Sequence, residues 1–238
     1  MRLPLCVLLL AAGCSASPVE LALSDVVLRV EPANGRIRAT RPDGTIILDS
    51  LGGGSVEAGK PPHVGFAFEN ASPQWTELYG AFQVQDSDPA WQGVRAFHDV
   101  AKLPDGISFA IDGPDGGGSG SIRRVGDGTL ELTVAAPKLG RASAAFHCAP
   151  DERFLGFGAM PMDVEHRGST VPLWVSEQGV GRVASDDYPA DWFLRGTRHQ
   201  TYFPVPFFVS SHDYGVLADT TRRSVFAMCS EAEDAWRV

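Results

Sequence analysis

The sequence predicts an all-β protein with little helix, and three observations support this fold class. Asn34-Gly35, Asp43-Gly44 and Asp127-Gly128 each stand between segments in which apolar and polar residues alternate. An Asx-Gly pair in this position is the strongest short-range signal for a β-hairpin. No stretch of ten or more residues shows a capped apolar stripe with a 3.6-residue period. Short, regularly spaced strands in a chain of 238 residues fit a single β-sandwich or barrel.

The strand pattern continues along the first half of the chain. Short alternating segments run from residue 21 to about residue 134, with a less regular stretch between residues 67 and 101 that can hold longer loops. The glycine-rich segment 113–120 has strands of similar character on both sides. We therefore interpret this segment as a long hairpin tip rather than as a linker between domains.

A second group of strands is expected near residues 201–217. Pro204 and Pro206 indicate an edge strand or the start of a strand, because proline cannot donate a ladder hydrogen bond. We expect Tyr214-Gly215 to form the following turn and Val216-Leu217 to begin the return strand.

The N-terminus has the pattern of an export signal. One arginine, an apolar run and small residues occupy "MRLPLCVLLLAAGC", which is too short for a permanent membrane span. The last four residues resemble the lipobox of bacterial lipoproteins. We expect residues 1–17 to be a signal peptide with Cys14 as the lipid attachment site, which would anchor an exported protein to a bacterial cell envelope. The alternative is an ordinary secretory signal cut near Ser17.

Charge and cysteine content exclude some classes of function. Removal of residues 1–13 takes away Arg2 and changes the formal net charge from −9 to −10. Such an acidic chain, without a basic run, has no electrostatic basis for binding nucleic acid, and it would reach a membrane only through a lipid anchor. Cys148 and Cys229 remain after export. Their apolar, strand-like surroundings slightly favour two buried free thiols, although an oxidising compartment permits a bond.

The stretch "PLWVSEQGVGR", residues 172–182, raises the question of a binding site. It places Glu177, Gln178 and Arg182 around two glycines directly after a strand-like segment. These side chains either rim a sugar pocket or only build a turn, in which Glu177 pairs with Arg182 and Gln178 caps the turn. Trp192 lies in a loop-like segment and is the tryptophan best placed to stack on a sugar ring, whereas Trp174 is expected in the core.

Two blocks in the second half of the chain carry a family resemblance. The blocks are "DERFLGFGAMPMDVEHRGSTVPLWVSEQGVGR", residues 151–182, and "TYFPVPFFVSSHDYGVLADTTRRSVFAM", residues 201–228. Together they resemble the N-terminal domain of glycoside hydrolase family 31, and "SEQGVGR" is most similar to the sulfoquinovosidase branch of this family. One position departs from the pattern, because many relatives have an acidic residue where this chain has Ala159.

The resemblance implies a galactose-mutarotase-like β-sandwich, or supersandwich, over residues 18–238. In the family this sandwich precedes a (β/α)8 barrel, which carries two catalytic aspartates and needs about 250 residues. Neither aspartate motif occurs before Val238, so we expect this chain alone to be catalytically silent. The expected partners are a carbohydrate substrate, an α-glycoside, and a barrel in cis or in trans. The region from Phe203 to Phe208 should then expose an apolar docking patch.

Other chemistries are not indicated. His147, His166, His199 and His212 show no metal-ligand spacing with one another or with cysteine, so we expect neither a metal nor a cofactor. An active aldose mutarotase would rest on fold analogy alone. A second hypothesis is an autonomous carbohydrate-binding surface lipoprotein, which would use exposed aromatic residues and need no barrel. The sequence does not specify the sugar, the linkage or the oligomeric state.

Overall fold

The computed structural model describes residues 17–70, 73–78, 81–85, 90–112, 117–137, 140–175 and 198–238. Throughout these ranges the regular structure consists of strands and one short 3-10 helix, η1 (Pro32–Asn34), which confirms the predicted all-β class. None of the described segments forms a helix long and apolar enough to cross a membrane. The predicted signal region and Cys14 lie outside the described residues.

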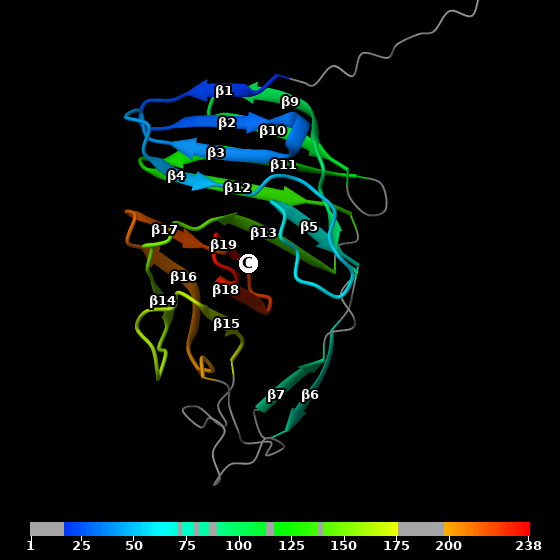
Figure 1. Cartoon of the computed structure of the whole chain (residues 1–238), viewed down its shortest axis with the longest axis vertical. Helices are drawn as coiled ribbons and strands as arrows, with labels where there is room; N and C mark the ends of the chain where they lie inside the picture. The colour runs from blue at the N-terminus through cyan, green and yellow to red at the C-terminus, as the bar shows by residue number, and fades with distance from the viewer. Residues whose placement is uncertain are drawn as a thin grey trace, which may run out of the picture.

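Two antiparallel four-stranded sheets form the N-terminal half and face each other (Figure 1). The first has the order β1-β2-β3-β4 and consists of β1 (Val19–Ala22), β2 (Val27–Glu31), β3 (Arg36–Thr40) and β4 (Ile46–Asp49). The second has the order β12-β11-β10-β9 and consists of β9 (Phe97–Leu103), β10 (Gly106–Ile111), β11 (Gly118–Gly126) and β12 (Thr129–Ala135).

The predicted hairpins are present at the predicted positions. Gly35, Gly44 and Gly128 close the β2–β3, β3–β4 and β11–β12 connections with φ values of 60°, 90° and 66°. Glycine suits these turns because it has no Cβ to clash in the left-handed region. The glycine-rich segment is also a hairpin tip, since Ile111 of β10 pairs directly with Gly118 of β11.

Three further sheets combine the strands between residues 66 and 93 with the strands that follow residue 140. A six-stranded sheet has the order β15-β18-β19-β13-β5-β8, a three-stranded sheet has the order β14-β16-β17, and β6 pairs with β7. Their strands are β5 (Phe66–Glu69), β6 (Gln74–Leu78), β7 (Ala81–Gln85), β8 (Gln92–Gly93), β13 (Arg141–His147), β14 (Phe154–Gly158), β15 (Ser169–Leu173), β16 (Pro204–Ser210), β17 (Tyr214–Leu217), β18 (Ser224–Ala232) and β19 (Ala235–Arg237).

The β16–β17 hairpin corrects one prediction and confirms another. Pro204 begins β16, as expected for a strand start, and pairing with β17 begins only at Phe207. Tyr214-Gly215 is not the turn, because both residues belong to β17 and pair with residues of β16. The turn comes just before it, where Asp213 has a φ of 59°. Aspartate tolerates this left-handed conformation better than most residues, so the turn closes without glycine.

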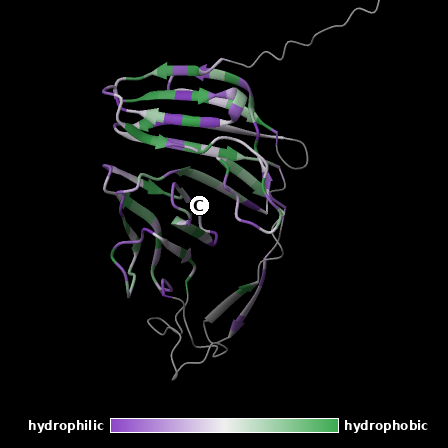
Figure 2. Ribbon diagram, viewed as in Figure 1, coloured by the Kyte–Doolittle hydropathy of each residue, from purple (hydrophilic) through white to green (hydrophobic). Residues whose placement is uncertain are grey.

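The core consists of two main apolar clusters. The larger lies between the two N-terminal sheets, where alternate residues of each strand point inward. Figure 2 shows this alternation as green and purple bands along the strands. The second cluster packs aromatic rings between β13, β14, β16, β18 and β19. Phe154, Phe157, Phe208, Phe226 and Trp236 are its large, fully buried side chains.

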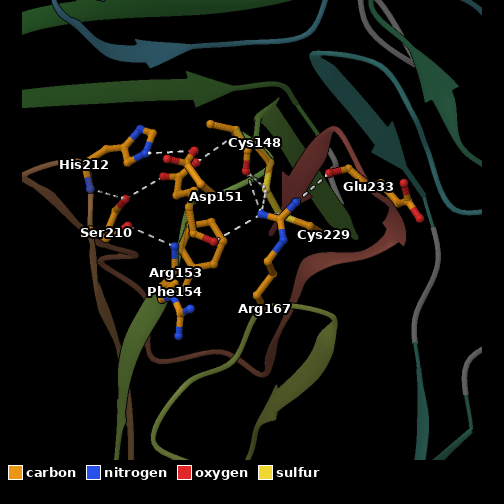
Figure 3. The surroundings of a disulfide bond; sticks show 12 residues. Cys148, Asp151, Arg153, Phe154, Arg167, Ser210, His212, Cys229 and Glu233 are labelled. Atoms are coloured by element: carbon orange, nitrogen blue, oxygen red, sulfur yellow. Dashed lines mark hydrogen bonds and ion pairs between the residues drawn. A yellow bond between two sulfur atoms is a disulfide. The ribbon is translucent and has the colours of Figure 1, made fainter.

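A disulfide bond joins Cys148 to Cys229, so the expectation of two free thiols is wrong (Figure 3). Cys148 directly follows β13, and Cys229 lies where β18 bulges, with a φ of 55°. The bulge turns the second side chain toward the first, and the two Cα atoms are 6.6 Å apart. A strand pattern does not reveal this bulge. Arg167 covers the bond and donates through Nη1 to the Ala149 carbonyl oxygen at 2.8 Å.

Replacing both cysteines with serine should lower the free energy of unfolding by about 4 kcal/mol. The bond closes a loop across a sequence separation of 81 residues, and cross-linking a loop of this length removes much of the entropy of the unfolded chain. Urea unfolding of the double variant and of the chemically reduced native chain would measure the loss. Equal stability of the reduced and oxidised chains would contradict the prediction.

Candidate functional site

The predicted binding residues belong to one segment, and the structure describes the residues on both sides of it. Glu177, Gln178, Arg182 and Trp192 lie in residues 176–197, outside the described part of the chain. At the margins of this segment, Val175 and Thr201 form a parallel bridge just beyond β15 and just before β16. The structure therefore describes the stem of the candidate loop, which we define as residues 159–166 together with Val175 and residues 198–203.

An ion-pair cluster holds the second end of the loop. Asp163 accepts hydrogen bonds from Arg198 Nε at 2.6 Å and Nη2 at 2.7 Å, and its Oδ2 lies 3.0 Å from His199 Nε2. The bonds from Arg198 are the main reason that the pKa of Asp163 lies below its usual range. This two-pronged geometry fixes the direction of the guanidinium group as well as its charge.

A buried histidine lies beneath this cluster. His166 has no exposed surface, and its ring packs edge-on against His199 at 5.4 Å and against Phe157 at 5.2 Å. Burial, followed by the nearby His199, lowers the pKa of His166. The neutral ring is therefore the form that the folded stem favours near neutral pH.

The Gly-x-Gly motif of the sequence builds a bulge in β14. Gly156, Phe157 and Gly158 have φ values of 144°, 69° and 91°, and the β14–β16 register shifts at this point. A Cβ on Gly158 would collide with the carbonyl oxygen of Phe203. The two glycines allow this close approach, and the bulge directs Phe157 into the aromatic core, where it contacts Phe226 at 5.1 Å.

Position 159, where many relatives have an acidic residue, contributes through its backbone in this chain. Ala159 contributes its backbone to the stem, since its N–H donates to Phe203 at 3.1 Å and its carbonyl accepts from Thr201 Oγ1 at 2.7 Å. Thr201 is buried and also accepts a hydrogen bond from the Phe203 N–H. These bonds connect the residues after β14 to the residues before β16.

A buried carboxylate joins the two motif blocks. Glu152 is 2% exposed, and its Oε1 accepts from Ser210 Oγ and Tyr214 Oη, both at 2.5 Å. Its Oε2 accepts from the Ala149 N–H at 3.1 Å. Burial, and then the bond to Glu152, raises the pKa of Tyr214. Glu152, Ser210 and Tyr214 thus form a buried hydrogen-bonded network that connects the two motif blocks.

The outer face of the β14–β16–β17 sheet is apolar. Alternate residues point away from the core, where Leu155 pairs with Val209 and Phe207 pairs with Leu217. Tyr202 and Phe203 of the loop stem are exposed as well, so exposed apolar side chains occur in the region from Phe203 to Phe208 where the patch was predicted, although Phe208 itself is buried. The six exposed side chains are 40% to 62% accessible: Leu155, Tyr202, Phe203, Phe207, Val209 and Leu217.

The other histidines and tryptophans considered in the sequence analysis differ in exposure. His147 and His212 are exposed, and the described residues contain no group of three or more His, Cys, Asp or Glu side chains suited to a metal ion. Trp236 is buried, Trp174 is partly buried, and Trp75 is exposed on β6. No signal in the sequence indicated that His166 and His199 would meet, because they lie on separate segments.

Comparisons with known proteins agree on one family. Residues 133–226 match the family model of the glycosyl hydrolase 31 N-terminal galactose mutarotase-like domain. A sulfoquinovosidase from Agrobacterium fabrum (strain C58) is 30% identical over 101 residues, which are 41% of this chain and 15% of that protein. The chain therefore corresponds to only a small part of the length of this relative.

One solved structure shows the same fold. A GH31 family sulfoquinovosidase from E. rectale superposes with a TM-score of 0.66 at 17% identity, covering 88% of this chain and 30% of that chain. A GH31 dextranase from Flavobacterium johnsoniae aligns over 94% of this chain and 24% of its own, with 17% identity, but its TM-score of 0.35 carries no argument.

Acidification should weaken the loop stem through His166. Because its folded pKa is lowered, this group contributes its full stability above the unfolded value of about 6.5, and the contribution is lost as pH falls below that value. The free energy of unfolding should therefore decrease between pH 7.5 and 5.5, and His166→Phe should flatten this decrease. Urea titrations at several pH values would measure it.

His147→Gln is the matched control, because this histidine is exposed. The control should keep the pH dependence of the native chain. An unchanged pH dependence in His166→Phe would show that the buried ring is not its source.

Proposed function

We propose that this chain is the non-catalytic β-sandwich of a sulfoquinovosidase-like α-glycosidase, and the match of residues 133–226 to the glycosyl hydrolase 31 N-terminal galactose mutarotase-like domain supports this proposal. In this role the sandwich supports a catalytic barrel and contributes the 176–197 loop to the rim of its sugar site. The barrel is supplied in cis or in trans.

The apolar face is the observation that carries this proposal. Monomeric soluble proteins rarely expose contiguous apolar surface unless it serves an interface. Leu155, Val209 and Leu217 offer no hydrogen-bonding group to a sugar, so a protein partner fits this face better than a carbohydrate does. This argues against the autonomous carbohydrate-binding alternative and in favour of a docked catalytic domain.

The loop stem supports the second part of the proposal. It adjoins the apolar face directly, because Tyr202 and Phe203 follow the Val175–Thr201 bridge. A domain docked on the face therefore lies beside the segment that carries Glu177, Gln178, Arg182 and Trp192. The guanidinium fork of Arg182 suits an anionic sulfonate, and Trp192 suits the apolar face of a sugar ring.

Export to a bacterial cell envelope belongs to the same proposal. The predicted signal region and Cys14 lead to an exported, lipid-anchored protein, and the disulfide bond between Cys148 and Cys229 favours an oxidising compartment. Both features are compatible with an enzyme that acts outside the cytoplasm.

The isolated chain should not hydrolyse aryl α-glucosides, aryl α-xylosides or aryl sulfoquinovosides, because paired catalytic carboxylates are expected on the barrel. A chimera tests the support role. The chain is joined to the catalytic domain of the Agrobacterium fabrum sulfoquinovosidase in place of that enzyme's own N-terminal region, and it should cleave aryl sulfoquinovosides faster than the catalytic domain alone.

Val209→Lys in the chimera should lower kcat/KM at least about tenfold, since a lysine charge would be buried in the apolar interface. Ile46→Lys on β4 is the matched control, because Ile46 is also an exposed aliphatic side chain on a strand and lies outside the apolar face. Equal activity of the two variants, or no activity gain in the chimera, would reject the docking role of the apolar face.

Arg182→Lys tests the loop. In the active chimera it should reduce kcat/KM for an aryl sulfoquinovoside by a factor that corresponds to a loss of about 1–3 kcal/mol in transition-state stabilisation. The kcat/KM for an unsulfonated aryl glucoside should stay unchanged. Lysine keeps the charge but loses the planar fork. If both substrates are cleaved as before, Arg182 only builds a turn and does not recognise the sulfonate.

A further inference from the structure

A long groove separates the two halves of the described structure. It has a volume of about 1990 Å³ and lies between β12 of the upper sheets, and β13, β17 and the C-terminal residues below them. Its upper wall includes Leu130, Leu132 and Val134, which are alternate residues of β12 and only half-buried. Since β12 is the last strand of its sheet, this wall has no further strand beside it among the described residues.

The lower wall contains a strand that is paired on only one side over part of its length. β13 pairs with β5 from Arg141 to Ala144, but its pairing with β19 covers only Ala145 to His147. Beyond β19, Ala144 exchanges two backbone hydrogen bonds with Val238, at 2.8 and 3.0 Å. Within the described part of the chain, residues 141–143 have no strand on this second side.

Strand geometry gives the direction of the backbone groups at this position. In an antiparallel ladder, backbone groups two residues apart point toward the same neighbour. Because Ala144 bonds to Val238, the N–H and carbonyl of Ala142 point to the same side, in line with β19 and into the groove. Ala142 is exposed and also lines the groove.

The side chains of β13 and of the last residues of the chain point to the same face at alternate positions. Phe146 belongs to the second apolar cluster. Ala144, on the same face of β13, and Leu132 of β12 both pack against this cluster, so this face of β13 points to the upper wall. Phe146 pairs with Trp236, and Ala144 bonds to Val238, so the last residues of the chain share that face at every second position. A strand in line with β19 would therefore bury alternate side chains against β12.

We propose that this groove binds one further β-strand, antiparallel to β13 and with apolar residues at alternate positions, contributed by the polypeptide that carries the catalytic domain. The source of the strand rests on the proposed function. Ala142 and Ser143 of β13 are open to it, a length of about 7 Å. A strand is the occupant that fits, because the groove continues the established β13–β19 pairing and offers backbone groups at strand spacing.

Two extensions of the full chain test the geometry. One adds Thr-Val-Thr-Val-Thr directly after Val238, which directs its valines into the groove, and the other adds Val-Thr-Val-Thr-Val, which directs them away. The first should slow amide hydrogen exchange at Ala142 at least about tenfold, because its N–H gains a partner. The second should leave this exchange unchanged.

The amides of Arg141 and Ser143 are internal controls, because they point toward β5, and their exchange should be alike in both extended chains and in the native chain. An identical effect of both extensions, or unchanged exchange at Ala142 in the first, would overturn the strand position.

The chimera tests the source of the strand. Its Ala142 amide should exchange as slowly as in the matched extension. A chimera that is active while Ala142 exchanges as fast as in the isolated chain would reject this use of the groove and leave the proposed function intact. A protected Ala142 in an inactive chimera would support the groove and reject the proposed function.

Discussion

The C-terminal half of the protein depends on the backbone of three residues, Gly156, Phe157 and Gly158, all of which have positive φ. This conformation costs a non-glycine residue about 1–2 kcal/mol. The cost is offset because the bulge buries Phe157 completely among other aromatic rings. The same bulge brings Ala159 to Thr201 and Phe203, and it therefore sets where both ends of the candidate loop begin.

The residues that make this sequence recognisable are mainly those that hold the framework. Glu152 gathers Ser210 and Tyr214 in a buried network, and the glycine pair shapes the bulge. Buried polar groups of this kind need every partner in place, which restricts the residue types that fit. Recognisable motif residues can thus be residues that hold the framework of a domain, and function has to be argued from the neighbouring surface and from the segment that carries the predicted site residues.

The sequence predicted those features of the fold that depend on neighbouring residues. Asx-Gly pairs located three hairpins because turn geometry is set by a few consecutive residues, and alternation identified the strands. Features that depend on distant contacts were missed. The disulfide bond required a bulge at Cys229, the turn before Tyr214 relied on an unusual Asp213 conformation, and the packing of His166 on His199 brought two separate segments together. The site residues from Glu177 to Trp192 stay a prediction.

The disulfide bond has a topological consequence for the loop. Cys148 and Cys229 close a covalent ring that contains both motif blocks and the whole segment between Val175 and Arg198. A single cut of the backbone anywhere inside this ring leaves the two pieces attached through sulfur. A cut between Val175 and Arg198 would therefore release neither fragment while the disulfide bond is intact, and the aromatic core would still hold the strands on both sides of the cut together.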